Sequence, residues 1–176
     1  MREATATKTT ASILHNFYDC PDKTYLTQFV DQMKQFKESN RYNFRQSFVG
    51  MIQSILIDFC DVNENDPSNK RTNLIEKIIF QFFQKDLIDL STDKVVNVRL
   101  YLAEAFYRFY KRFEKIELES QNQNLNIRVR AAYLEKKNLI DKYFNTKFFK
   151  ILQTLKYDES ESVTEFLTIL NVNPND

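Results

Sequence analysis

The residues best placed to do chemistry in this sequence are an acidic and a basic residue six positions apart. Asp93 and Arg99 have this spacing. Two further pairs share it with one residue replaced: Ser39 stands for the acid six residues before Arg45, and Thr164 stands for the base six residues after Asp158. Arg99 stands in the first turn of an expected helix, where the helix dipole slightly disfavours a cation. A second interaction must therefore favour Arg99 at this place.

No arrangement of residues typical of catalysis is present. Cys20 and Cys60 have no basic partner nearby in the sequence, as a reactive thiol requires. His15 is the only histidine, and no metal-ligand spacing surrounds it. A single glycine, Gly50, excludes a glycine-rich phosphate loop. We expect a protein that is not an enzyme, with no catalytic residues, no metal and no cofactor.

Composition predicts an all-α fold. Among 176 residues there are one glycine and three prolines, and no Asn-Gly dipeptide of the kind that forms tight hairpins. Sixteen phenylalanines and nine tyrosines must then be buried between helices. The predicted core residues are Phe29, Phe48, Ile55, Ile78, Phe82, Leu102, Phe106, Phe109, Leu152 and Phe166.

Charge and hydrophobicity exclude several functional classes. Twenty-five Lys and Arg residues balance 24 Asp and Glu residues, which does not favour binding to nucleic acid or to an anionic membrane. No apolar run approaches the length of a membrane span, and two cysteines are typical of a reducing compartment. We expect a soluble protein of the cytoplasm, present also in the nucleus.

The sequence repeats a unit made of an amphipathic helix, a short polar turn and a second amphipathic helix. We expect complete units at 22–60, 72–113 and 146–171, within a single array that spans 1–176. Residues 1–19 resemble the second helix of an incomplete unit, which would make the chain either a fragment or an incomplete gene product. Residues 114–145 are expected to be a polar, Asn/Gln-rich insertion with one extra helix, and a change at Lys136 there should have almost no effect on partner binding.

Helix pairs with Asp in the turn and Arg in the first turn of the second helix resemble HEAT repeats. The resemblance implies an α-solenoid of stacked antiparallel helix pairs, whose Asp and Arg side chains form a hydrogen-bonded ladder along the turns. The implied ladder consists of Arg45, Asp93, Arg99 and Asp158. Arg99 is then expected to meet the carboxylates of Asp93 and Asp158, and Arg45 to lie near Asp93.

The segments "SNRYNFRQSFVGMIQSILIDFC" and "DLSTDKVVNVRLYLAEAF" are similar to the C-terminal repeats of the scaffold (A) subunit of protein phosphatase 2A, or of its close relative, the protein phosphatase 4 regulatory subunit 1. This resemblance implies a non-catalytic scaffold that binds a type 2A or type 4 catalytic subunit through its turns. A further regulatory subunit would bind to missing N-terminal repeats. The implied contact residues are Tyr42, Arg45, Val95, Asp158 and Glu159. Val95 is expected to be exposed.

An alternative remains open at this point. A HEAT-repeat array is also typical of adaptors in other protein complexes, such as those of transport or chromosome organisation.

Overall fold

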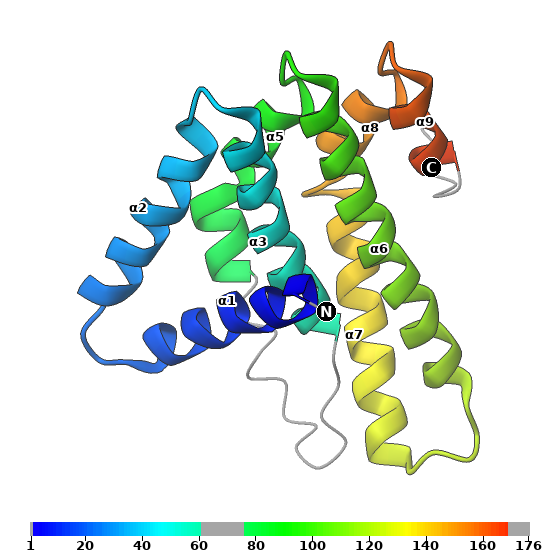
Figure 1. Cartoon of the computed structure of the whole chain (residues 1–176). Coiled ribbons are helices and arrows are strands. Elements are labelled where there is room, and N and C mark those ends of the chain that lie inside the picture. The colour runs from blue at the N-terminus through cyan, green and yellow to red at the C-terminus, as the bar shows by residue number, and fades with distance from the viewer. Residues whose placement is uncertain (1, 61–75, 169–176) are drawn as a thin grey trace.

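The computed structural model describes residues 2–60 and 76–168, and every regular element in these ranges is a helix (Figure 1). The elements are α1 (Arg2–Asp19), α2 (Thr24–Glu38), α3 (Tyr42–Cys60), the π-helical segment η1 (Glu76–Phe83), α5 (Gln84–Ser91), α6 (Val96–Gln121), α7 (Ile127–Asn145), α8 (Phe149–Lys156) and α9 (Glu161–Thr168). The predicted all-α class is confirmed. No helix in these ranges has the length and apolar character needed to cross a bilayer.

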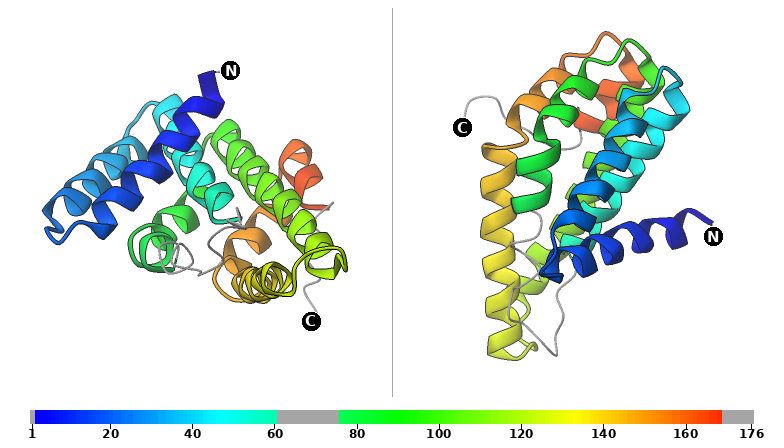
Figure 2. Two further views of the ribbon diagram at one scale, coloured as in Figure 1. Left: turned by 90° about the horizontal axis from the view of Figure 1, so that it is seen from below. Right: turned by 90° about the vertical axis from the view of Figure 1, so that its left-hand side faces the viewer.

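Three antiparallel helix pairs form the body of the molecule. They are α2 with α3, η1 and α5 with α6, and α8 with α9, and each pair contacts the next through its second helix, since α3 packs on α6 and α6 on α9. The turns within the pairs all lie at the same edge, at the top of Figure 1 and again at the top of the right-hand view in Figure 2. Residues 72–75 and 169–171 of the expected units lie outside the described residues.

Two helical segments are interrupted at equivalent positions before a turn. One is the first helix of the second pair, and the other is the segment that precedes the third turn. Phe83 ends η1 and precedes α5, and Phe148 separates α7 from α8. Each phenylalanine stands ten residues before the Asp of the following turn, and both are completely buried. The first unit has no such break, because Phe29, ten residues before Ser39, lies inside the continuous helix α2. The second and third units therefore share the break.

The stretch 114–145 differs from the polar insertion that we expected. It does contain the extra helix, α7, but residues 114–121 continue α6, and only 122–126 connect the two helices. Ile116 on α6 and Ile140 on α7 are buried, and α7 packs along α6 and against α8. The connection ends in a helix cap, because Asn126 Oδ1 accepts the N–H of Arg128 at 2.9 Å. The polar composition therefore describes a short turn and not a loosely held insertion.

Lys136 on α7 is buried and joins α7 to α3. It is only 2% exposed, its Nζ donates to the main-chain oxygen of Phe59 at 2.7 Å, and it lies 4.6 Å from the centre of the Phe59 ring. The ammonium thus satisfies a carbonyl in the last turn of α3, where a helix leaves its carbonyls without intrahelical partners.

α1 has the expected bounds but not the expected orientation. It crosses α2 and α3 steeply, instead of lying alongside α3 as α6 does (Figure 2). Its first turn lies away from the row of turns in Figure 1, whereas the second helix of a pair would begin in that row. Ala11 and Leu14 are buried, so α1 covers the lower part of the first pair.

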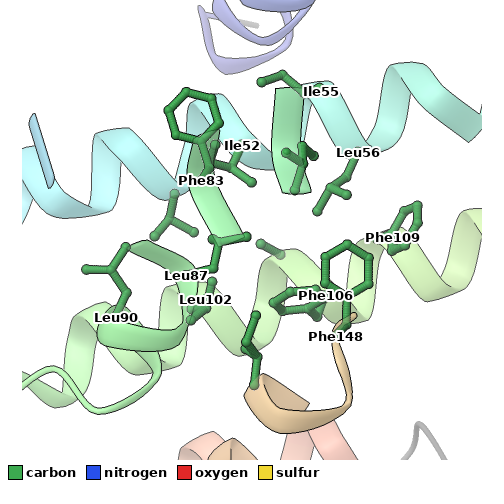
Figure 3. Close-up of a cluster of buried hydrophobic side chains, with 14 of the residues drawn as sticks. Ile52, Ile55, Leu56, Phe83, Leu87, Leu90, Leu102, Phe106, Phe109 and Phe148 are labelled. Atoms are coloured by element: carbon green, nitrogen blue, oxygen red, sulfur yellow. The ribbon is translucent and has the colours of Figure 1, made fainter. Parts of the chain in front are cut away.

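The core lies between the pairs (Figure 3). Ile52, Ile55 and Leu56 of α3 meet side chains of η1, α5 and α6 there, with Phe148 closing the cluster. Seven of the ten predicted core residues are buried, namely Phe48, Ile55, Ile78, Leu102, Phe106, Phe109 and Leu152. The other three, Phe29, Phe82 and Phe166, are partly buried and pack against the same core. The core prediction is therefore confirmed in its main part.

Replacing the buried Leu102 by Ala should lower the free energy of unfolding by about 2–5 kcal/mol, because it removes methyl groups from a closed core and leaves a cavity. Urea denaturation followed by circular dichroism measures the change. Leu118→Ala is the matched control, since Leu118 lies on the same helix and is 69% exposed. Equal effects of the two substitutions would contradict the burial assigned to α6.

Candidate functional site

The turn residue Asp93 organises the second turn by two bonds to its own segment. Its Oδ1 accepts the N–H of Val95 at 2.8 Å, and its main-chain oxygen accepts Arg99 Nη1 at 2.6 Å. Asp158 begins the third turn in the same way, since its Oδ1 accepts the N–H of Ser160 at 2.9 Å. A short acidic side chain that bonds its own backbone two residues on is typical of a turn.

Two bidentate ion pairs join the three turns. Arg45 donates from Nε and Nη2 to the carboxylate of Asp93, at 2.6 and 3.0 Å. Arg99 donates in the same fork geometry to Asp158, at 2.5 and 3.0 Å. The predicted ladder is confirmed by these contacts, with one difference: in its own turn Arg99 meets the main-chain oxygen of Asp93 and not the carboxylate.

The ladder is buried, which sets its electrostatics. The side chains of Arg45, Asp93, Arg99 and Asp158 are each at most 9% exposed. Burial raises the pKa of the Asp93 carboxyl, but hydrogen bonds from Arg45 and the Val95 N–H outweigh it and hold that pKa below 3.8. Burial likewise raises the pKa of Asp158, and the hydrogen bonds from Arg99 and the Ser160 N–H reverse the shift. Both carboxyls are therefore ionised at neutral pH.

The two positions that would extend the ladder at its ends are occupied by neutral polar residues. In the first turn Ser39 occupies the acidic position, and its main-chain oxygen accepts Arg45 Nη1 at 2.8 Å. In the third turn Thr164 occupies the basic position and bonds the main-chain oxygen of Glu161 at 3.0 Å. The ladder among the described residues thus has two rungs, with no unpaired charge at either end.

Further polar contacts between the first two turns reinforce the ladder. Gln46 Nε2 donates to the main-chain oxygen of Asn97 at 3.0 Å. Lys37 lies 2.9 Å from Asp89 and 3.3 Å from Asp86. Burial lowers the pKa of Lys37, but the bonds to these two carboxylates outweigh burial and raise it. Gln46 and Lys37 were not among the residues that the sequence suggested, because neither occupies a position shared by all three turns.

Each turn presents at least one large apolar or aromatic side chain to solvent. The first turn has Tyr42 at 48% and Phe44 at 37% exposure, the second has Val96 at 37% and the third has Tyr157 at 68%. Tyr42 begins α3, Val96 begins α6 and Tyr157 follows α8, so these side chains belong to the edge where the turns line up (Figure 1). We call Tyr42, Val96 and Tyr157, together with the turns that carry them, the turn row. Aromatic side chains on rigid supports are typical of protein-binding surfaces.

The residues predicted to contact a partner separate into two groups. Tyr42 is exposed, and the Glu159 side chain is 85% exposed beside Arg99. Arg45 and Asp158 are buried within the ladder and serve the turns themselves.

Val95 is half-buried and packs against the core, so the expectation that it is exposed is wrong. Val95, Val98 and Leu102 have the spacing of one helical face. This spacing indicates that Val95 points toward the core and Val96 away from it, so it is the signal that could have corrected the expectation. Tyr157 was missed, because it precedes the turn Asp instead of following it.

No group of three or more His, Cys, Asp or Glu side chains suited to a metal ion occurs in the described ranges.

No protein-family model, curated protein or solved structure matches this chain.

Replacing Arg99 by Met should lower the free energy of unfolding by about 3–5 kcal/mol, because the Asp158 carboxylate would stay buried without its partner. Changing Asp158 to Leu in the same chain should recover part of that loss, as a double-mutant cycle in urea would measure. Arg108→Met is the control, since Arg108 pairs with Glu104 on the surface, and should cost about 1 kcal/mol or less. Additive effects at Arg99 and Asp158 would contradict the coupling.

Acid should weaken the fold through the same carboxylates. Because the folded pKa values of Asp93 and Asp158 lie below 3.8, the stability that they contribute is complete above pH 3.8 and is lost as the pH falls through the folded values. In Arg45→Met, burial remains but the favourable bonds to Asp93 are lost, so the decline in unfolding free energy from pH 5 to pH 3 should be smaller than in the unaltered chain. A decline of the same size in both proteins would show that Asp93 does not carry the effect.

Proposed function

We propose that this chain is a non-catalytic scaffold of the HEAT-repeat type, an α-solenoid of stacked antiparallel helix pairs, that binds a large protein partner through the turn row. The partner that we propose is the catalytic subunit of a type 2A or type 4 serine/threonine protein phosphatase. The observation that carries the proposal is the buried ladder, in which Arg45 and Arg99 each join one turn to the next.

The ladder supports a binding role because it makes the turn row rigid. Each arginine bonds its own turn through one nitrogen and the following turn through the other two. The relative positions of successive turns are thereby set before a partner arrives. A surface that is ordered in the free protein loses little conformational entropy on binding. This is the property that a scaffold requires.

The exposed side chains supply the affinity. Tyr42, Val96 and Tyr157 lie on three separate turns, so a partner must be large enough to span the row. An extended apolar contact with polar neighbours, such as Glu159 beside Arg99, favours a folded globular partner over a small ligand.

The type of partner rests on the sequence resemblance described above. The two segments that carry it, residues 39–60 and 89–106, supply the first two turns of the row. A scaffold of this kind would act in the cytoplasm and the nucleus.

Changing Tyr42 and Tyr157 together to Ala should weaken binding to the purified catalytic subunit by about 1–3 kcal/mol per anchor. Calorimetric titration of the full chain with the type 2A and type 4 subunits, taken separately, measures the loss. Leu118→Ala is the control, because Leu118 is exposed but lies near the far end of α6. Undiminished binding of the double variant would exclude the turn row. Absence of binding by the unaltered chain to either subunit would exclude the phosphatase as partner.

A further inference from the structure

The first turn is built like the other two but lacks their acidic side chain. Ser39 Oγ accepts the N–H of Arg41 at 3.2 Å, as the carboxylates of Asp93 and Asp158 accept the N–H two residues on. The main-chain oxygen of Ser39 accepts Arg45 Nη1, as that of Asp93 accepts Arg99 Nη1. Only the negative charge is missing. We propose that Ser39 is a phosphorylation site, and that the phosphoryl group supplies an anion at the position of Asp93 and Asp158.

The hydroxyl lies where a kinase can reach it. Ser39 is the C-cap of α2 and has extended backbone, with φ −62° and ψ 137°. The side chains around it, Glu38, Asn40 and Arg41, are exposed. By contrast, Ser47 is exposed but lies inside α3 and bonds the main-chain oxygen of Asn43. Ser39 itself is half-buried, but its non-helical backbone and its exposed neighbours suit an enzyme that must surround the residue.

The reaction is an ordinary phosphoryl transfer from ATP. Ser39 Oγ bonds to the γ-phosphorus, the bond from that phosphorus to the β–γ bridging oxygen breaks, and ADP leaves. The hydroxyl proton passes to the catalytic aspartate of the kinase. The product adds a charge of about −1.5 to −2 at neutral pH.

Cations already surround the place that the phosphoryl group would occupy. Arg45 Nη1 is bonded to the main-chain oxygen of Ser39 at 2.8 Å. Arg41, two residues after Ser39, is exposed. Its side chain forms no ion pair with another described residue. The first turn of α3, which begins at Tyr42, adds a favourable helix dipole. Arg45 Nε and Nη2 are already bonded to the Asp93 carboxylate, so the Arg41 guanidinium and the N-terminus of α3 would hold the phosphate in the first turn.

The third turn offers a matched contrast. Ser162 is exposed, but it lies among the carboxylates of Glu159, Glu161 and Glu165 in the sequence. A phosphoryl group on Ser162 would meet like charges. The two serines differ in their charged surroundings and also in their backbone, because Ser162 lies in α9 and Ser39 lies outside a helix.

The test compares full chains that carry phosphoserine at 39 or at 162, installed by genetic-code expansion. Phosphoserine at 39 should raise the Tm by about 2–4 °C, on the scale of one or two charge-assisted hydrogen bonds in a domain of this size. Arg41→Gln should remove most of that rise, whereas phosphoserine at 162 should not raise the Tm. An unchanged or lower Tm for the chain modified at 39, or a rise that survives Arg41→Gln, would overturn the proposal.

A second arm tests modification itself. The full chain is incubated with Mg-ATP and a serine/threonine kinase that recognises basic residues near its target, and the product is mapped by mass spectrometry. Ser39 should be the principal site, and S39A should lose most of the label while S47A keeps it. Label that persists in S39A, or no label at Ser39, counts against the site. Neither arm contains a phosphatase subunit, so its result is independent of the proposed function.

Discussion

The buried pairing of Arg45 with Asp93 and of Arg99 with Asp158 is the interaction on which the arrangement of this chain depends. Each carboxylate bonds its own turn and the arginine of the preceding pair. Taking such charges out of water is costly, and the cost is offset only when the geometry is close to ideal. The pairs therefore contribute less to net stability than to the choice of one arrangement, because a shifted turn would leave a charge buried and unpaired.

The helix pairs are joined elsewhere by contacts of a different kind. Between the turns and the far ends of the helices, apolar side chains such as Ile52, Phe83 and Phe106 fill the space (Figure 3). At the far end of α3, Lys136 reaches from α7 to the main-chain oxygen of Phe59. Polar contacts thus specify both ends of α3, and the non-directional hydrophobic contacts between them supply most of the stabilisation.

This division of roles leaves the outward surface of the turns free for recognition. The polar groups of the ladder are engaged inside, so what solvent meets is Tyr42, Val96, Tyr157 and the carboxylate of Glu159. A change at these residues leaves the ladder intact, whereas a change at Arg45 or Asp158 disturbs the turns themselves. Mutation can therefore test the proposed binding separately from folding, even though the residues concerned are neighbours.

The sequence by itself determined the helical class and most of the core, because each of these depends on spacing along one segment. The ladder joins residues 48 and 59 positions apart, and it was expected from the resemblance to HEAT repeats. Apolar residues three and four apart mark a helical face, and an acid six residues before an arginine marks a turn followed by a helix. Tertiary structure alone decided the features that depend on distant segments. Lys136 is buried because Phe59, 77 residues earlier, lies over it. The course of α1 across the first pair is set by its contacts with α2 and α3. The Asn/Gln-rich composition near residue 120 suggested a loose insertion, but α6 and α7 pack along each other there and hold all but five residues in helices. Burial is a property of what surrounds a side chain, and only the folded chain brings those surroundings together.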